Sequence, residues 1–448
     1  MTDPAAHAAA TGVHATESLL FLVLLQLVVI VASARIGSAV ARRFGQSAAV
    51  GEIVVGILLG PSLFGLLAPD VFHYVFRSAP PEPMQMLSQV GLLLLMFQIG
   101  LEFDFSHLAL ARNRKAVGAV AVATLVAPFV LGLGFGYASA PVLSPGVHRM
   151  ATALYVATAF SITALPILGR IMIELAITRT ELGVIAISAA ALNDVAGWLM
   201  LAVVSSLAVS GFAPVPFALR IACIGAFVAF AWLVVRPLAW RVLARLAPRD
   251  GSLGAHQLGV LLGLIFLGGM ATYQLGIFAI FGGFMAGVLF HDDARLVRAW
   301  NERVGHFVVV FFLPIFFTYT GLRTEIGSLD SAAAWGWCLL LIALATLGKY
   351  GGAYGAARWV GLGHHQASVL GVMMNTRALM ELIVINVGFD LGVISRQMFT
   401  MLVLMAVAST VVTTPLLRAW LPKALPGGWV PPRPEGAAPR ASAGELSP

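Results

Sequence analysis

Long apolar runs separated by short polar connections make up most of the chain. Runs of about twenty apolar residues recur from Leu19 to Trp420, and each is long enough to cross a hydrocarbon core of about 30 Å as a helix. We place about thirteen spans, near Leu19 to Val40, Ala48 to Leu67, Met86 to Phe103, Val117 to Tyr137, Thr152 to Ile173, Leu182 to Val209, Phe217 to Leu238, Leu258 to Leu275, Phe278 to Phe290, Phe307 to Gly321, Ala332 to Tyr354, Ala367 to Phe389 and Phe399 to Trp420. The pattern predicts an all-α polytopic membrane protein. The region from Leu258 to Phe290 also fits one broken helix.

Basic residues in the connections predict how the chain is oriented. They gather in alternate connections, at Arg42, Arg43, Arg112, Arg114, Lys115, Arg170, Arg179, Arg241, Arg245, Arg249, Arg295, Arg298 and Arg303. By the positive-inside rule these connections are cytoplasmic, so the N-terminus lies outside and the C-terminus inside. We therefore divide the chain into an extracytoplasmic tail (1–17), a transmembrane domain (18–423) and a cytoplasmic tail (424–448). The last is rich in Pro, Gly and Ala, a composition that predicts disorder.

The composition excludes several classes of protein. Hydrophobic residues make up 59% of the chain and charged residues 10%, against about 25% charged residues in soluble domains. The formal charge of +7 does not indicate a nucleic-acid partner, because the basic residues are spread over short loops without interleaved aromatic residues. Cys223 and Cys338 lie in apolar segments, so no disulfide framework is expected.

An amide and a carboxylate, Asn193 and Asp194, stand side by side in an otherwise apolar run. An ionisable group at the bilayer centre costs roughly 3 kcal/mol, so it usually faces a cavity or a partner. Small residues flank Asp194 at helical spacing: Ala186, Ala190 and Gly197. Because small residues let a neighbouring helix approach closely, we expect Asp194 to line a helix crossing. The alternative is a carboxylate that forms a salt bridge for packing alone.

Proline interrupts the fifth span. Pro166 should disturb the backbone around Ile162, because proline removes a helical hydrogen bond and clashes with the carbonyl four residues back. This would free carbonyl oxygens beside Ser161 and Thr163. Irregular backbone at membrane depth is tolerated only where it meets protein or water, which favours a ligand role; a simple kink is the alternative.

Polar residues interrupt the twelfth span. Asn375 and Thr376 suit the cap of a second half-helix, while Arg377 and Glu381 are four residues apart and can pair, which we expect to be structural. If the seventh span links two halves of six, the two breaks occupy corresponding positions. Matching breaks are typical of an inverted-repeat transporter with its site near the midplane.

Lys349 lies inside the eleventh span among glycines. It is too deep to reach the membrane surface easily, so it should point toward the polar centre. Its charge either tunes Asp194, or offsets the negative ends of the half-helices, or forms an internal ion pair.

Several motifs together resemble those of the monovalent cation:proton antiporter-2 family, which includes Kef-type potassium efflux systems and plant cation/H+ exchangers. They are the stretches Gly51 to Ser62, Ser161 to Leu168, Ala189 to Trp198, Phe312 to Thr324, Gly348 to Lys349 and Asn375 to Val384. The resemblance implies an NhaA-like inverted repeat with two crossed discontinuous helices. It also implies a core domain, a dimerisation domain, and elevator-like alternating access by a homodimer in the cell inner (plasma) membrane.

The resemblance also implies roles for individual residues. It maps Asp194 to the acid that binds the ion or the proton, Asn193 to its partner, and Lys349 to the basic residue of the core. Electrogenic relatives have two adjacent aspartates, whereas this chain has Asn193 before Asp194, as electroneutral members do. Neither an enzymatic activity nor a cofactor is implied, apart from the transported Na+ or K+ and H+.

A single carboxylate holds one proton or one monovalent cation, and each disfavours the other through charge competition. We therefore predict that Asp194, Asn193 and oxygens of Ser161 and Thr163 coordinate Na+ or K+ in exchange for protons. If the negatively charged core cannot cross without an ion, exchange is one for one and electroneutral. A cation channel and a sodium-coupled symporter of an organic anion are the alternative functions.

Overall fold

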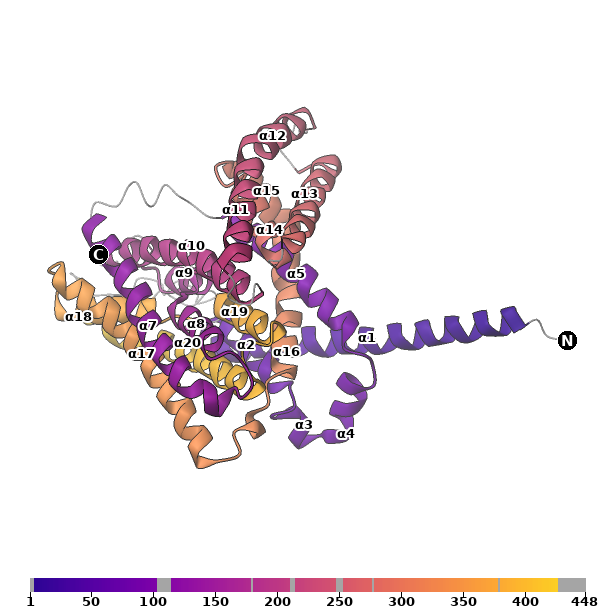
Figure 1. Ribbon diagram of the computed structural model, residues 1–448, viewed down its shortest axis with the longest axis horizontal. Helices are drawn as coiled ribbons and strands as arrows, with labels where there is room; N and C mark the ends of the chain where they lie inside the picture. The colour runs from indigo at the N-terminus through magenta and orange to yellow at the C-terminus, as the bar shows by residue number, and fades with distance from the viewer. Residues whose placement is uncertain are drawn as a thin grey trace, which may run out of the picture.

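The computed structural model describes residues 4–102, 114–178, 180–209, 214–246, 253–275, 278–377 and 379–425. The described chain is nearly all helical (Figure 1). Its longer helices are α1 (Pro4–Arg43), α2 (Ala48–Leu58), α5 (Glu82–Leu101), α7 (Arg114–Leu143), α8 (Arg149–Ser161), α9 (Leu165–Glu174), α10 (Glu181–Val209), α11 (Pro214–Phe230), α12 (Arg236–Arg245), α13 (Ala255–Gln274), α14 (Ala279–Val288), α16 (Leu313–Leu322), α17 (Ala332–Trp359), α18 (His364–Met374), α19 (Leu379–Asp390) and α20 (Arg396–Ala424). The shorter ones are α3 (Phe64–Leu67), α4 (Pro69–Phe72), α15 (Ala294–Trp300), and the π- or 3₁₀-helical segments η1 (His73–Arg77), η2 (Ala231–Val235), η3 (Asn301–Gly305), η4 (Val308–Phe312) and η5 (Ile326–Ser328).

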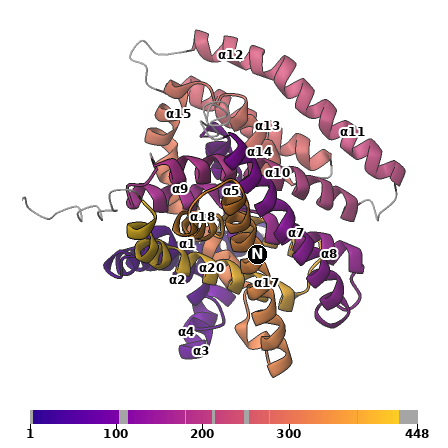
Figure 2. The same ribbon diagram turned by 90° about the vertical axis from the view of Figure 1, so that its left-hand side faces the viewer.

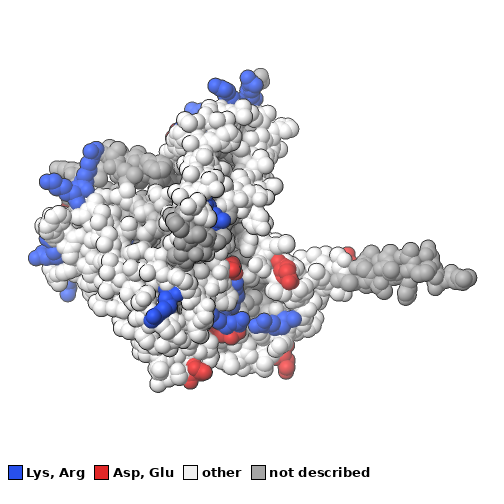
Figure 3. Space-filling view, viewed as in Figure 1, with Lys and Arg blue, Asp and Glu red and all other residues white. Residues whose placement is uncertain are grey.

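The all-α membrane architecture expected from the sequence is confirmed. Within the described ranges, nine helices are long and apolar enough to cross a membrane, and α18 with α19 forms a bent pair that adds a tenth. Helix occupies part of every expected span, but α2 and α14 are too short to count by length, and so are α8 and α9, the two halves of the fifth span. The number thirteen therefore stays a prediction. Most of the face shown in Figure 3 carries no charged side chain, as expected of a surface that meets lipid.

One boundary differs from the expected one, and the two expected spans between Leu258 and Phe290 are present in place of the alternative of one broken helix. The N-terminal tail is helical from Pro4, because α1 continues the first span toward the N-terminus. Between Leu258 and Phe290 the chain forms two helices that pack on each other and not one broken helix, since a side chain at Gly282 would lie 2.1 Å from the Gly268 backbone. The C-terminal tail predicted to be disordered lies, from residue 426 onward, outside the described residues.

The helices pack as two bundles. We call α1, α2, α5, α13, α14 and α16 the scaffold bundle, and α7, α8, α9, α10, α17, α18, α19 and α20 the core bundle, because the closest packing lies within each set. In Figure 1 the α7, α17 and α18 helices lie on the side opposite to the projecting α1. Figure 2 shows α11 and α12 along the edge of the molecule, where only 6% of the apolar window in Ala218–Arg245 is buried.

Glycines allow the helix backbones of the scaffold bundle to approach one another closely. A side chain at Gly60 would lie 2.2 Å from the Gly321 carbonyl oxygen, and one at Gly287 would lie 2.1 Å from the Phe97 carbonyl oxygen. Gly60, which follows α2, and Gly287 of α14 therefore let α2 pack closely on α16 and α14 on α5.

Candidate functional site

The two interrupted helices meet at their breaks. Helix α8 ends at Ser161, three residues follow in non-helical conformation, and α9 begins at Leu165. The other break separates α18 from α19, whose axes differ by 42°. The Ala164 amide donates a hydrogen bond to the Thr376 carbonyl at 3.2 Å, so backbone freed by one break is satisfied by the other. Pro166 is the second residue of α9, a position where proline needs no helical donor. The break therefore precedes the proline, as predicted.

Two buried cations neutralise the negative C-terminal end of α8. Arg377 donates to the carbonyls of Ala159 at 3.2 Å and Phe160 at 3.1 Å. The Lys349 ammonium donates to the Ser161 carbonyl and, at 2.6 Å, to Thr163 Oγ1. Both cations are fully buried. The last carbonyls of a helix carry partial negative charge that cations stabilise, so Lys349 offsets a half-helix end, one of the roles weighed from the sequence.

This arrangement changes one expectation about the ligands. The sequence suggested free carbonyl oxygens beside Ser161, but that residue's carbonyl already accepts from Lys349, and its hydroxyl donates to the Ala157 carbonyl at 2.8 Å. The reason is that carbonyls released by a break in a low-dielectric interior need donors, and long basic side chains from other helices supply them here.

The expected pair of Arg377 and Glu381 forms with an N–O distance of 3.0 Å, and both side chains are almost fully buried. Arg377 lies in the break and not on the surface of the second half-helix, and it also donates to the Ala345 carbonyl of α17 at 3.1 Å. One arginine thus ties α8, α17 and α19 together.

Asp194 lies in α10 at the boundary between the two bundles. It is 2% exposed, and neither carboxylate oxygen accepts a hydrogen bond of ordinary geometry from a described residue, although the Leu165 backbone and the charge of Lys349 interact with it. Its small recess is lined by Ile162 from the break, by Gly197 and Trp198 of α10, and by Met380 and Val384 of α19. Asp194 therefore lines a helix crossing, as expected from its flanking small residues, and within the described ranges no basic side chain forms a salt bridge with it, although the charge of Lys349 acts on it.

Trp198 shows that this recess faces the scaffold bundle. Its ring lies 5.4 Å from Phe281 and 5.7 Å from Phe284, both of α14, measured between ring centroids. Gly197 lets α10 approach the break, since a side chain there would lie 2.8 Å from Ile162. The acid thus sits close to the surface along which the core bundle contacts the scaffold bundle.

Asn193 points to a different set of side chains. Its Nδ2 donates to Thr124 Oγ1 at 2.8 Å and lies 3.5 Å from Thr163 Oγ1. Adjacent residues on a helix diverge by about 100°, which separates the amide from the carboxylate of Asp194. Thr124 on α7 was missed from the sequence; its signal was the one aliphatic hydroxyl in the otherwise apolar fourth span.

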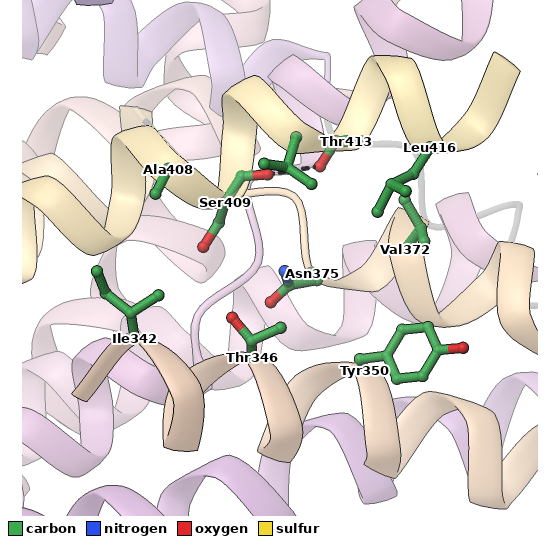
Figure 4. A pocket seen from close by; sticks show the side chains of 10 residues that line it. Ile342, Thr346, Tyr350, Val372, Asn375, Ala408, Ser409, Thr413 and Leu416 are labelled. Atoms are coloured by element: carbon green, nitrogen blue, oxygen red, sulfur yellow. Dashed lines mark hydrogen bonds between the residues drawn. The ribbon is translucent and has the colours of Figure 1, made fainter. Parts of the chain in front are cut away.

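Asn375 and Thr376 form no cap to a described residue of the second half-helix. Neither Asn375 Oδ1 nor Thr376 Oγ1 accepts a hydrogen bond from a described residue. Asn375 instead ends α18 and faces a separate cavity of about 150 Å³ between α17, α18 and α20 (Figure 4). Thr346 and Ser409 approach Asn375 from the neighbouring helices in this view. The sequence could not show that this residue turns away from Asp194.

Comparison with known families decides the kind of protein. A family model described as "Sodium/hydrogen exchanger, transmembrane" matches residues 28–423. The chain belongs to this sodium/hydrogen exchanger family. It is a family of transporters, so this exchanger-family chain is a multi-pass membrane protein and not an enzyme, and the resemblance to cation:proton antiporters is confirmed.

Curated relatives of this exchanger-family chain include antiporters of plants, cyanobacteria and yeast. Cation/H(+) antiporter 17 of Arabidopsis thaliana is 34% identical over 408 residues, which cover 91% of this chain and 49% of that protein. Na(+)/H(+) antiporter NhaS4 of Synechocystis sp. is 34% identical over 402 residues, covering 89% and 97%. K(+)/H(+) antiporter 1 of Saccharomyces cerevisiae is 29% identical over 389 residues, covering 84% and 44%. The chain thus spans about half the length of the plant and yeast relatives.

A solved structure has the same fold. The sodium proton antiporter MjNhaP1 of Methanocaldococcus jannaschii superposes with a TM-score of 0.58 at 13% identity, covering 90% of this exchanger-family chain and 97% of that one.

No group of three or more His, Cys, Asp or Glu side chains in the described part of the chain is placed to hold a metal ion.

Proposed function

We propose that the chain is a secondary active antiporter that exchanges a monovalent cation, Na+ or K+, for protons. The observation that carries this proposal is the buried Asp194, which forms no salt bridge and accepts no side-chain hydrogen bond among the described residues. Such an acid is costly unless it binds something during function. The names of the curated relatives support the same activity.

Competition for Asp194 couples the two fluxes. A cation and a proton cannot both neutralise one carboxylate, so binding of one releases the other. In our proposal Asn193, Ser161 and Thr163 supply further oxygens after a rearrangement of the site, because the Ser161 carbonyl now accepts from Lys349 and the Asn193 amide now contacts Thr124. Because the Lys349 ammonium holds Thr163 Oγ1, a metal ion that uses this hydroxyl takes the place of the lysine hydrogen bond. In this structure the Lys349 ammonium therefore lies at Thr163 Oγ1, where the transported ion binds in our proposal.

The location of Asp194 supports an elevator-type cycle. Its recess borders Trp198, which packs on the scaffold bundle. Sliding of the core bundle along the scaffold bundle would carry the acid from one side of the membrane to the other, with residues 18–423 as the transport unit. The scaffold helices would then also serve as the dimerisation helices of a homodimer.

Proteoliposomes with a pH-sensitive dye inside provide the test. We expect addition of Na+ or K+ to drive proton movement, and Asp194→Asn to abolish it while leaving the amount of folded protein unchanged. Asp292→Asn is the matched control, because Asp292 is half exposed and pairs with Arg236 near one end of α12. Proton-coupled cation flux that persists in Asp194→Asn contradicts the assignment, and cation flux that ignores the proton gradient indicates a channel.

Electroneutrality is tested separately. Moving one charge per cycle through 100 mV is worth about 2.3 kcal/mol, so electrogenic exchange responds strongly to voltage. We propose one-for-one exchange and expect the rate to be unchanged when a potassium–valinomycin potential is imposed on Na+ exchange. A response of the rate or of the final gradient to that potential contradicts the stoichiometry.

Location, orientation and assembly are further proposals. We propose the plasma membrane as the location, and the loop charges favour an N-terminus outside and a C-terminus in the cytoplasm. Protease protection of tags at the two termini tests the orientation. Cross-linking in native membranes tests the homodimer, and a monomer at all cross-linker concentrations contradicts it.

A further inference from the structure

Polar side chains join the scaffold bundle to the core bundle at one end of the molecule. Thr320 and Arg323 belong to the end of α16, and Asn386 and Asp390 to the end of α19. Asn386 donates to Thr320 Oγ1 at 2.9 Å, Arg323 donates to Asn386 Oδ1 at 3.0 Å, and Arg323 also pairs with Asp390. We call these four residues the outer latch, since the loop charges place this end outside.

The outer latch connects helices that pack mainly elsewhere. Helix α16 packs on α2 and α5, whereas α19 packs on α20 and α8. The guanidinium of Arg323 also lies over an aromatic ring of the core bundle, 4.6 Å from the centroid of Phe389. A cation over an aromatic face adds attraction to that of its carboxylate, so one arginine of the scaffold bundle is held by both charge and ring.

Each half of the outer latch is fixed to its own bundle. On the scaffold side, Gly321 lies against the α2 backbone, since a side chain there would be 2.1 Å from the Gly56 carbonyl oxygen. On the core side, Asn386 Nδ2 also donates to the Leu382 carbonyl at 2.9 Å, which holds the amide against α19. Since neither half can shift relative to its own bundle, movement of one bundle past the other at this end must break the contacts of the outer latch.

A second pair of contacts lies beside it. Arg396, the first residue of α20, pairs with Glu325 at 2.6 Å, and Gln397 donates to the Ser328 carbonyl at 3.2 Å. Arg396 is 55% exposed, so this pair is screened by solvent and contributes little. Thr320 and Asn386 are buried, which makes the outer latch the stronger of the two connections.

We propose that Arg323, Asp390, Asn386 and Thr320 close the outer end of the boundary between the bundles and must separate once in each transport cycle. The inference rests on the proposed exchange by movement of the core bundle. The four are positioning residues, because they hold the bundles and do not touch the transported ion.

A reversible disulfide tests the proposal. We would introduce Thr320→Cys and Asn386→Cys, whose side chains are in hydrogen-bond contact, after replacing Cys223 and Cys338 by alanine. We expect oxidation to stop cation–proton exchange and a reductant to restore it. The matched control is Ser62→Cys with Ile326→Cys, which joins two segments on the scaffold side, where the Ile326 amide donates to Ser62 Oγ at 2.9 Å. Its oxidation should leave exchange unchanged.

The outcomes separate the two proposals. Exchange at the full rate in a fully oxidised Thr320→Cys/Asn386→Cys protein overturns the outer latch but not the exchanger. Absence of exchange in the cysteine-free parent, when the native sequence is equally inactive, overturns the exchanger.

A second measurement needs no transport and decides the latch even if the paired variant fails to fold. A single cysteine at Thr320 is buried beneath Arg323 and Asp390, so its reaction with a membrane-impermeant thiol reagent reports opening of the outer latch. We expect Asp390→Asn to accelerate that reaction about two- to five-fold, the effect of removing a partly exposed ion pair. Asp292→Asn should not change it. An unchanged rate in Asp390→Asn overturns the proposal.

Discussion

Replacing Arg377 with methionine should destabilise the protein more than any other single change at the crossed breaks. The substitution keeps an unbranched side chain but removes the buried pair with Glu381 and the donors to three carbonyls, those of Ala159, Phe160 and Ala345. Breaking a buried ion pair by removing one partner costs about 3–5 kcal/mol. Each carbonyl left without a donor adds about 1 kcal/mol or more.

We therefore expect Arg377→Met to cost at least about 4 kcal/mol, a large part of the roughly 5–15 kcal/mol that stabilises most proteins. Glu381→Met should cost less, because Arg377 keeps its three carbonyl partners. The double variant should lose less than the sum of the two single variants, since each single variant leaves an uncompensated buried charge and the double variant leaves none. The assay is unfolding of the detergent-solubilised protein, followed by the fluorescence of its nine tryptophans.

Arg396→Met is the control for loss of an arginine. Its pair with Glu325 has side chains that are 55% and 35% exposed, so the expected cost is within about 1 kcal/mol. If Arg377→Met were no more destabilising than Arg396→Met, the two cations at the end of α8 would not stabilise the crossing, and the physical account of the breaks would be wrong.

Three further predictions concern single contacts. Thr124→Val should lower the free energy of unfolding by about 1–2 kcal/mol, because Asn193 Nδ2 loses its acceptor at 2.8 Å. Thr124→Ser keeps the hydroxyl and should not lower it, so equal losses in the two variants refute this prediction. Gly321→Ala should cost about 1–3 kcal/mol because α2 is too close, and Gly327→Ala, with nothing within 4 Å, should be neutral; equal thermal stability of both proteins argues against tight packing. Lys349→Met should lower stability and leave less than about a tenth of the exchange rate, since a charge-assisted bond to the Ser161 carbonyl is lost; wild-type rates in proteoliposomes contradict a role for this lysine.

The sequence predicted the fold and the break positions because their signals are local. Apolar run length is set by bilayer thickness, and Pro166 marks its break through its own geometry. The direction of Asn375 and the donors to the α8 carbonyls depend on how distant helices are placed, which no local pattern specifies. Thr124 was missed for the same reason, since only the packing of α7 on α10 shows that it meets Asn193.

Helix α17 is connected to both breaks. Lys349 and the Ala345 carbonyl of this 28-residue helix bind the end of α8 and Arg377, and its close contacts with α7 run along the same bundle. Hydrogen bonds thus hold the crossed breaks against α17, a helix long enough to span the membrane. Spin labels on α17 and on α8 should accordingly keep a constant separation throughout turnover, while either label changes its distance to one on α5.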